Sequence, residues 1–258
     1  MTRRTERREM IYGVNAVRAV FDMRRDDIER IARARAIAPA LATLIRWAGT
    51  QKVQHDVLPD RELDRIAQST HHEGIIIATR PRTWISPTEL ALSLGSAVVV
   101  DGVANPHNVG AIVRTAAFFG FDGVLVAAPL EHPGMPPAAV RIAQGGAERL
   151  MLARTHDLPA ALDELARRGI TVVGADPHAK HDIAEHQFQR PVAVVVGSER
   201  EGLAAPVRAR CKTLVAIRGG GAVESLNAAV AAGIVMAAVA RTHPDEMHLE
   251  QKTVRRRP

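Results

Sequence analysis

The sequence has little cysteine, few aromatic residues and no apolar run long enough to span a membrane. Cys211 is the one cysteine among 258 residues, so no intramolecular disulfide forms and the chain suits a reducing compartment. The longest uncharged apolar stretch, 226–240, has 15 residues and contains Asn227, whereas a bilayer span needs about 18. No apolar segment follows the basic start, so we expect no secretory signal, no membrane partner and a cytoplasmic location.

Aromatic residues make up only 3% of the chain, so alanine and valine must fill most of the core. The 47% apolar and 24% charged residues are typical of a globular protein. Its 34 basic and 28 acidic residues give a net charge of +6, and residues 1–35 hold 10 Arg against 6 acids. Arginine suits phosphate groups, although charge alone fits a solvated basic surface equally well.

Two changes of pattern divide the chain into five spans. Residues 1–9 and 244–258 are predicted to be basic, flexible ends. Residues 10–80 are predicted to form a small αβ domain, and residues 81–95, which contain two prolines, a linker. From residue 96 to residue 243, strands dense in valine alternate with helices, which indicates a parallel sheet covered on both faces.

Periodicity predicts the elements within these spans. Helices are expected over 11–21, 38–49, 59–69, 109–120, part of 138–150, 158–169, 203–211 and 225–240. Strands are expected over 52–58, 74–79, 97–101, 123–127, 170–175, 192–197 and 213–217. The stretch 28–37 fits a helix or a strand equally well.

Three strand-to-helix loops carry polar residues and glycines: 101–120, 194–203 and 217–231. Ligands of open α/β sheets bind at the carboxyl ends of the strands, where such loops meet. Each loop alone also fits an ordinary turn or helix cap, because Asn, Gly and Ser favour both. All three in one sheet favour a ligand site.

The three loops resemble motifs one, two and three of the SpoU family of RNA ribose 2′-O-methyltransferases. The matching segments are NVGAIVRTAAFFG (108–120), GSEREGL (197–203) and ESLNAAVAAGI (224–234). IAQGGAE (142–148) resembles the family segment between motifs one and two. The segment 10–80 is similar to the small, ribosomal-protein-like substrate-binding domain of members that act on large-subunit ribosomal RNA.

The resemblance implies an α/β catalytic domain with a parallel sheet and a C-terminal trefoil knot. It also implies S-adenosyl-L-methionine as cofactor, contacted by Gly197, Ile217 and Leu226. Three glycines, 219–221, would then allow the threaded chain a close backbone approach. The phosphate-binding GxGxxG turn of dehydrogenases does not follow the strand at 97–101, which disfavours a nucleotide-cofactor oxidoreductase.

The same resemblance implies a set of catalytic residues. Arg114 would act on the ribose hydroxyl, either as its base or by clamping the neighbouring phosphate, and a guanidinium that stays protonated suits the clamp at least as well. Glu199 would orient Arg114 or the first loop. Ser225 and Asn227 would cap the last helix. The implied catalytic residues are Asn108, Arg114, Glu199, Ser225 and Asn227.

The sequence departs from the family at motif three, where Arg218-Gly219 replaces the usual Pro-Met. Losing the fixed φ of proline is expected to loosen the loop and to weaken cofactor affinity. Arg218 would add a positive charge near the cofactor or the RNA path. Arg200 also replaces a smaller residue and would contact RNA. The histidines and acids of 176–186 match no metal-ligand spacing, so we expect no metal site.

The sequence therefore predicts a methyltransferase that modifies a ribose 2′-hydroxyl of RNA, ribosomal RNA first and transfer RNA second. A non-catalytic RNA-binding factor that keeps the fold is the alternative from another class. The expected partners are RNA and a second copy of the chain, because the apolar helix 226–240 exceeds what one sheet face can cover.

Overall fold

The computed structural model describes residues 8–127 and 135–242. These form two compact units: Met1–Thr83 with Met135–Arg149, and Trp84–Gly134 with Leu150–Pro258. The segment 135–149 therefore packs with the N-terminal residues, although the sequence places it within the span 96–243. Within the described residues, no helix is long and apolar enough to cross a bilayer.

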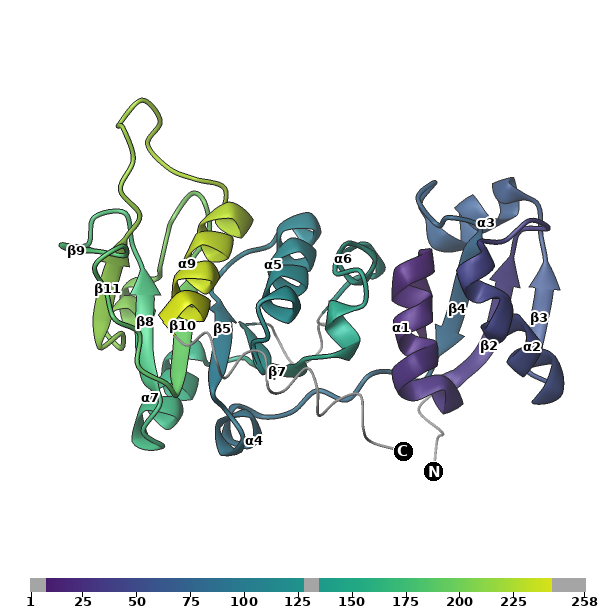
Figure 1. The fold of residues 1–258 in the computed structure, drawn as a ribbon, viewed down its shortest axis with the longest axis horizontal. Helices are drawn as coiled ribbons and strands as arrows, with labels where there is room; N and C mark the ends of the chain where they lie inside the picture. The colour runs from purple at the N-terminus through teal and green to yellow at the C-terminus, as the bar shows by residue number, and fades with distance from the viewer. Residues whose placement is uncertain (1–7, 128–134, 243–258) are drawn as a thin grey trace. The chain divides into compact units, whose positions relative to one another are not determined.

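The first unit is built on a four-stranded mixed sheet in the order β1-β4-β2-β3 (Figure 1). Strand β4 (Ile75–Thr79) is buried throughout and pairs antiparallel with β1 (Glu9–Tyr12) and β2 (Ile28–Arg33). Strand β3 (Gln54–Val57) extends the sheet parallel to β2. The run of three isoleucines in β4 explains its central place, because β-branched side chains pack well on both faces of a sheet.

Three helices, α1 (Val14–Arg24), α2 (Ala42–Thr50) and α3 (Asp60–Ala67), accompany this sheet, with 3₁₀ turns η1 (Arg25–Asp27) and η2 (Pro39–Leu41). The expected helix over 11–21 is wrong at its start, because the chain is still a strand there. Gly13, with φ 93°, turns the chain between β1 and α1, a conformation that favours glycine. The ambiguous stretch 28–37 provides β2.

A buried ion network joins the segment 135–149 to the rest of the first unit. This segment contains α6 (Pro137–Ile142) and η3 (Gly146–Glu148). Glu148, whose side chain is 5% exposed, lies 2.8 Å from the Arg24 guanidinium and 3.1 Å from that of Arg82. Glu9 pairs with the same two arginines at 3.0 and 2.6 Å, so two cations face two anions.

The pKa of Arg24 follows from this pairing. Burial lowers the pKa, but the hydrogen bond and charge of Glu148, together with Glu9 and Asp27, raise it above its usual value. The guanidinium therefore stays charged, and the network holds its compensating carboxylates in place.

The second unit contains a seven-stranded sheet in the order β7-β6-β5-β10-β8-β11-β9, and every pair in it is parallel. This confirms the parallel sheet predicted from the valine-rich strands. The strands are β5 (Ser96–Val100), β6 (Gly123–Ala127), β7 (Met151–Thr155), β8 (Thr171–Ala175), β9 (His181–Asp182), β10 (Val192–Val196) and β11 (Thr213–Ala216).

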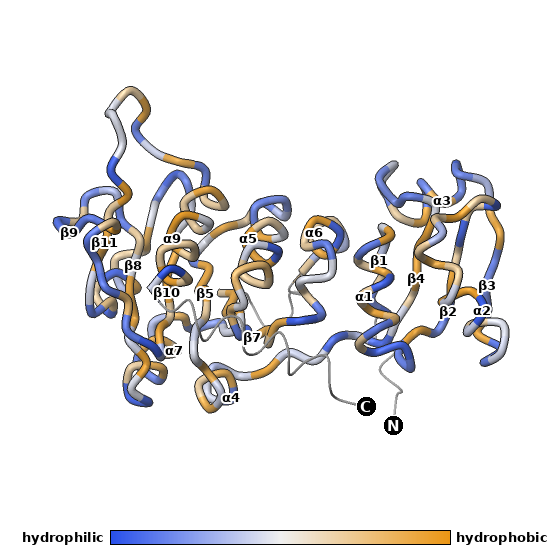
Figure 2. The backbone as a smooth tube through the Cα atoms, in the orientation of Figure 1, coloured by the Kyte–Doolittle hydropathy of each residue, from blue (hydrophilic) through white to orange (hydrophobic). Residues whose placement is uncertain are grey.

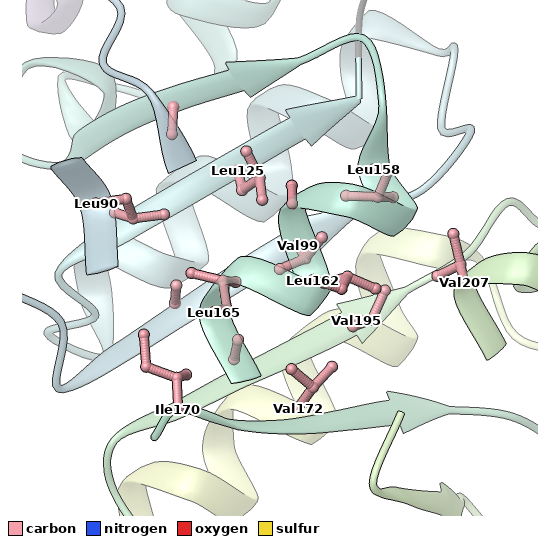
Figure 3. Close-up of a cluster of buried hydrophobic side chains, with 14 of the residues drawn as sticks. Leu90, Val99, Leu125, Leu158, Leu162, Leu165, Ile170, Val172, Val195 and Val207 are labelled. Carbon is pink, nitrogen blue, oxygen red and sulfur yellow. The ribbon is translucent and has the colours of Figure 1, made fainter. Parts of the chain in front are cut away.

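Helices cover both faces of this sheet, as Figure 1 shows. On one face, Val99 and Val195 point into a cluster with Leu162 of α7 (Figure 3). On the other face, α5 and α9 pack against each other and against the central strands. Figure 2 shows the apolar strands between the helices. The helices are α4 (Pro87–Leu92), α5 (Pro106–Phe118), α7 (Leu158–Arg167), α8 (Ala205–Arg208) and α9 (Ala228–Thr242).

Some elements of the second unit were not predicted. Helix α4 lies within the span expected as linker, where Ser86 and Glu89 form a reciprocal capping box. Strand β7 was missed because its sequence, MLART, has a polar end, and β9 because it has only two residues.

Glu148→Ala is expected to lower the free energy of unfolding of the first unit by about 3 kcal/mol, because it leaves two buried guanidinium groups with too few carboxylates. The side chain of Arg82 is 6% exposed and that of Arg24 is 16% exposed, so water compensates little. Urea unfolding measures this loss.

The fluorescence of Trp47, which lies in the first unit, reports the transition in a Trp84→Phe background. Asp56→Ala is the matched control. The side chain of Asp56 is 32% exposed and that of its partner Arg30 is 49% exposed, so this ion pair is expected to contribute less than about 1 kcal/mol. Equal losses in the two variants would contradict the buried network.

Candidate functional site

The strand order reverses between β5 and β10, and we call the edge of the sheet at the carboxyl ends of these two strands the crevice. From β5 the chain adds β6 and β7 on one side, and β10, β8, β11 and β9 lie on the other. Such a reversal of strand order is where open α/β sheets bind ligands, at the carboxyl ends of the strands. Asn108 follows β5 in the first turn of α5, and Glu199 follows β10.

Three of the predicted residues meet at this crevice. Oε1 of Glu199 accepts hydrogen bonds from Nδ2 of Asn108 at 2.5 Å and from Nδ2 of Asn227 at 2.8 Å. Asn227 Nδ2 also lies 3.1 Å from Oδ1 of Asn108, and the Ala228 N–H lies 3.3 Å from Glu199 Oε1. We call Asn108, Glu199 and Asn227 the amide–carboxylate cluster.

Burial of Asn108 makes its hydrogen bonds important for the local structure, whereas Glu199 and Asn227 are exposed. Asn108 is only 7% exposed, and a buried amide without partners costs free energy. Its partners come from two other loops, which lie 91 and 119 residues further along the chain. One carboxylate therefore fixes the three loops relative to one another. Glu199 orients the first loop, as one of its two expected roles requires.

Asn227 also caps the last helix. Its Oδ1 accepts from the N–H groups of Ala229 and Val230, at 3.0 and 3.3 Å. The helix α9 begins at Ala228, three residues after Ser225, where its start was expected. Ser225 is exposed and has no hydrogen-bond partner among the described residues, so the expected cap by Ser225 is not observed.

Arg114 lies apart from the cluster. It is six residues after Asn108 on α5, which puts it about 240° around the helix, and it is exposed whereas Asn108 is buried. Within the described part of the chain it makes no hydrogen bond or ion pair, so its guanidinium is available to a ligand. Glu199 does not orient Arg114 in this arrangement, because its carboxylate bonds to the two asparagines.

The residues expected to contact the cofactor lie in the second and third loops. Gly197 ends β10, and a Cβ there would lie 2.1 Å from the carbonyl oxygen of Gly202. The loop itself therefore requires glycine at this position, whatever binds beside it. Ile217 is half-buried after β11, and Leu226, just before Asn227, is 45% exposed.

The three glycines of the third loop do not make the close approach that we expected. A Cβ added at residue 219, 220 or 221 would meet nothing within 4 Å, and the loop rises away from β11 before it returns to α9 (Figure 1). Gly221 is nevertheless needed for its backbone, with φ 79°.

Arg218 has a role that the sequence did not indicate. Its Nη2 donates to the carbonyl oxygens of Ala179 at 2.8 Å and Lys180 at 3.2 Å. The side chain thereby ties the start of the third loop to the segment after β8. The guanidinium that we expected to be free near the cofactor or RNA path is therefore already bonded to the chain. The same bonds oppose the loosening of the loop that we expected from the loss of proline. No sequence pattern signals such a bond.

The histidine-rich stretch 176–186 is structural in the described chain. Asp176 is 6% exposed, pairs with Arg208 and accepts from the His178 N–H. Within the described residues, no group of three or more His, Cys, Asp or Glu side chains lies close enough to hold a metal ion.

Comparison with protein-family models identifies the chain. The model of the SpoU rRNA Methylase family matches residues 95–237, and that of the RNA 2′-O ribose methyltransferase substrate-binding domain matches residues 10–84. This chain belongs to the SpoU family. The second match covers most of the first unit's N-terminal part, and the first covers the strands and loops that form the crevice.

Curated SpoU relatives fall into two groups of different length. The 23S rRNA (guanosine-2′-O-)-methyltransferase RlmB of Vibrio vulnificus is 32% identical over 237 residues, which cover 88% of this chain and 94% of that protein. An uncharacterized tRNA/rRNA methyltransferase of Mycolicibacterium vanbaalenii is 38% identical over 190 residues, 71% of this chain. The match spans only about 60% of the length of that mycobacterial relative.

Solved structures of SpoU proteins share the fold. The SpoU methyltransferase AviRb from Streptomyces viridochromogenes, crystallised with AdoMet, has a TM-score of 0.79 at 22% identity. The similarity covers 92% of this chain and 91% of AviRb. An rRNA methyltransferase from Sinorhizobium meliloti reaches a TM-score of 0.76 at 19% identity, covering 92% of this chain and 88% of that one.

Glu199→Ala is expected to lower the free energy of unfolding of the second unit by about 2 kcal/mol, because the buried Asn108 amide loses its acceptor. Glu199→Gln keeps an oxygen at the centre of the cluster and is expected to cost about 1 kcal/mol, since a charge-assisted bond becomes a neutral one. Urea unfolding followed by circular dichroism measures both losses.

The neighbouring Glu201 provides the matched control, because its side chain is exposed and has no partner among the described residues. Glu201→Ala is expected to leave the stability unchanged. Amide hydrogen exchange gives a local reading, with faster exchange of the Ala228 N–H in Glu199→Ala only. Unchanged exchange there would show that Glu199 does not hold α9.

Proposed function

We propose that this chain transfers the methyl group of S-adenosyl-L-methionine to a ribose 2′-hydroxyl of RNA, with ribosomal RNA as the first candidate substrate. The observation that carries the proposal is the amide–carboxylate cluster at the crevice of a SpoU-family sheet. The near full-length similarity to an enzyme named for 23S rRNA supports ribosomal RNA. The mycobacterial relatives, named for tRNA or rRNA, keep transfer RNA as the second candidate.

The loops at the crevice suit this cofactor. Leu226 and Val223 are 45% and 80% exposed within the third loop, which leaves apolar surface that an adenine ring or a methionine chain would cover. Backbone N–H and C=O groups of the loop after Gly197 would supply polar contacts to the same ligand. Gly197, Ile217 and Leu226 would hold the cofactor, which supplies an activated methyl group on sulfur. The AdoMet complexes of two structural neighbours are consistent with this assignment.

For the chemistry, the chain must orient the ribose and favour loss of its hydroxyl proton. The amide–carboxylate cluster keeps the three loops in one arrangement, so the reacting groups meet with little loss of entropy. Arg114, exposed and unpaired among the described residues, would clamp the adjacent phosphate through its planar fork. Asn108, Glu199 and Asn227 are therefore positioning residues in this proposal.

Methyl transfer tests the proposal directly. Purified protein is incubated with tritiated S-adenosyl-L-methionine and ribosomal or transfer RNA from a strain that lacks the gene. Incorporation into ribosomal RNA, mapped to a 2′-O-methyl position missing from that strain, is expected. Incorporation into transfer RNA alone would show that transfer RNA, the second candidate, is the substrate. Binding of RNA without any incorporation would favour the non-catalytic factor.

The trefoil knot and the span boundaries belong to the same proposal. The knot is supported by SpoU membership and by helix α9, which returns to pack beside α5 and on β10. The RNA-binding role of residues 10–80 is supported by the substrate-binding family match. We also place the activity in the cytoplasm, on the grounds of the single cysteine.

An apolar face on α5 and α9 supports the homodimer. Phe118 of α5 is 75% exposed, and Val230 and Ile234, one turn apart on α9, are 51% and 37% exposed. The two helices pack side by side, and we call these three exposed residues the α5–α9 face. Exposed apolar patches of this kind mark protein interfaces, and a second copy would bury it symmetrically. Arg114, one turn before Phe118, borders this face.

Arg114→Ala is expected to lower the rate of methyl transfer by at least ~10²-fold and to leave cofactor affinity within a few-fold, because the arginine acts on the RNA. Arg114→Lys keeps the charge but loses the planar fork, so near-normal activity would exclude a bidentate clamp. Turnover assays and calorimetry with S-adenosyl-L-methionine give the two values. Arg167→Ala, an exposed arginine on the opposite sheet face, is the control.

Charge on the α5–α9 face is expected to separate the dimer. Val230→Asp should give a monomer by light scattering at micromolar concentration, because a carboxylate would be buried without a partner. Leu92→Asp is the matched control, since Leu92 is 69% exposed on α4, on the other side of the sheet. A monomeric wild-type chain would contradict the proposed dimer.

A further inference from the structure

The first unit contains a polar cavity outside the crevice. It has a volume of about 250 Å³ and lies between α1 and the segment 135–149. Its size is just below the ~300–1,000 Å³ of sites for drug-sized ligands, which suits one nucleotide unit better than a larger group. The lining residues are Asn15, Arg18, Ala19, Asp22, Gln144 and Arg149.

The two walls of this cavity come from distant parts of the sequence and are locked together. Asn15 Nδ2 donates to Oε1 of Gln144 at 2.5 Å, across 129 residues of sequence. Gly145 lies so close to α1 that a Cβ there would be 2.7 Å from the Cβ of Ala19. Next to the cavity, the buried ion pairs of Glu148 fix the second wall to the first unit. The cavity is therefore preorganised.

One residue of the same wall has a strained backbone. Gln144 has φ 52°, in the left-handed region that a residue with a Cβ rarely adopts. Glycine would hold this backbone more easily, so the glutamine side chain itself has a use. Its Oε1 accepts from Asn15, and its Nε2 donates to the Arg141 carbonyl oxygen at 3.1 Å. Strain of this kind clusters at ligand sites.

The charged groups at the rim are available to a ligand. Arg149 is exposed and makes no hydrogen bond or ion pair with the described residues. Arg18 is 58% exposed, and its contact with Asp22 is long, 3.9 Å. The lining of the cavity therefore includes two guanidinium groups, one carboxylate and two amides. Guanidinium groups recognise phosphate, and amide and carboxylate groups recognise the edges of bases.

From this arrangement we infer that the cavity is a binding subsite for one unpaired nucleotide of the RNA substrate. Arg18 and Arg149 contact its phosphate, while Asn15, Asp22 and Gln144 face its base. The inference rests on the proposed RNA methyltransferase function and adds a second RNA contact to it, outside the crevice. An unpaired nucleotide fits because the edge of its base is free to bond with these side chains, whereas the edges of paired bases are held within a helix.

Fluorescence anisotropy with a labelled single-stranded RNA of mixed sequence tests this inference without any methyl transfer. Arg149→Ala and Arg18→Ala are each expected to weaken binding about 10-fold, and each lost phosphate contact should reduce the slope of log affinity against log salt by about 0.7. The same RNA annealed to its complement should lose much less affinity, because its bases cannot enter the cavity.

Arg46→Ala is the matched control, because Arg46 is an exposed arginine of the same unit and, among the described residues, its side chain bonds only to Thr43. It removes the same charge outside the cavity, so its effect shows what general attraction contributes. Losses in Arg18→Ala and Arg149→Ala no larger than in Arg46→Ala would overturn the inference. So would an equal loss with the duplex.

Gln144→Gly separates the cavity from the fold. Glycine accepts the observed φ without strain, so the backbone is retained while the amide is lost. Affinity for the single-stranded RNA should fall several-fold, with unchanged cofactor affinity by calorimetry. The melting temperature should change little, because relief of the strain at Gln144 offsets its lost bond to Asn15. Unchanged RNA affinity in this variant would remove the base-binding part of the inference. Because these readouts need no catalysis, loss of the subsite and failure of the proposed function give different results.

Discussion

The second unit depends on one carboxylate that serves three loops. Glu199 accepts from Asn108, from Asn227 and from the first N–H of α9, so a single oxygen atom joins the ends of β5 and β10 to the start of the last helix. The parallel sheet brings these loops to one edge, but strand pairing alone would leave their tips free. The shared acceptor converts a common edge into a defined site. Loss of Glu199 would leave the buried amide of Asn108 without its acceptor.

Much of this arrangement could be predicted from the sequence. Valine-rich strands predicted the parallel sheet, and the resemblance to three SpoU motifs indicated the three loops that the structure brings together. The bond between Asn108 and Glu199 could not be predicted, because it depends on the strand order, which places β10 beside β5 across 91 intervening residues. The tether from Arg218 to two carbonyl oxygens was also missed, since backbone acceptors leave no pattern in the sequence.

The limits of the first unit were harder to predict for a related reason. Local periodicity assigned the segment 135–149 to the larger sheet, in whose sequence it lies. The ion pairs of Glu148 assign it instead to the N-terminal residues. Arg24 and Arg82 pair with Glu9 and Glu148, and these residues are too far apart in the sequence for a local pattern to indicate the pairing. Hydrophobic pattern thus predicted five of the seven strands of the larger sheet, whereas long-range polar contacts determined which segments belong together.

This discontinuity has a consequence for the order of events during synthesis. The ribosome releases Arg24 and Arg82 well before it has made Glu148, so the N-terminal unit emerges with two cations that lack half of their buried anions. It can form its strands early, but its ion network is completed only after the ribosome has also translated residues 83–148. An N-terminal unit normally completes its folding first during vectorial synthesis. Here its completion waits for the chain that also begins the second sheet.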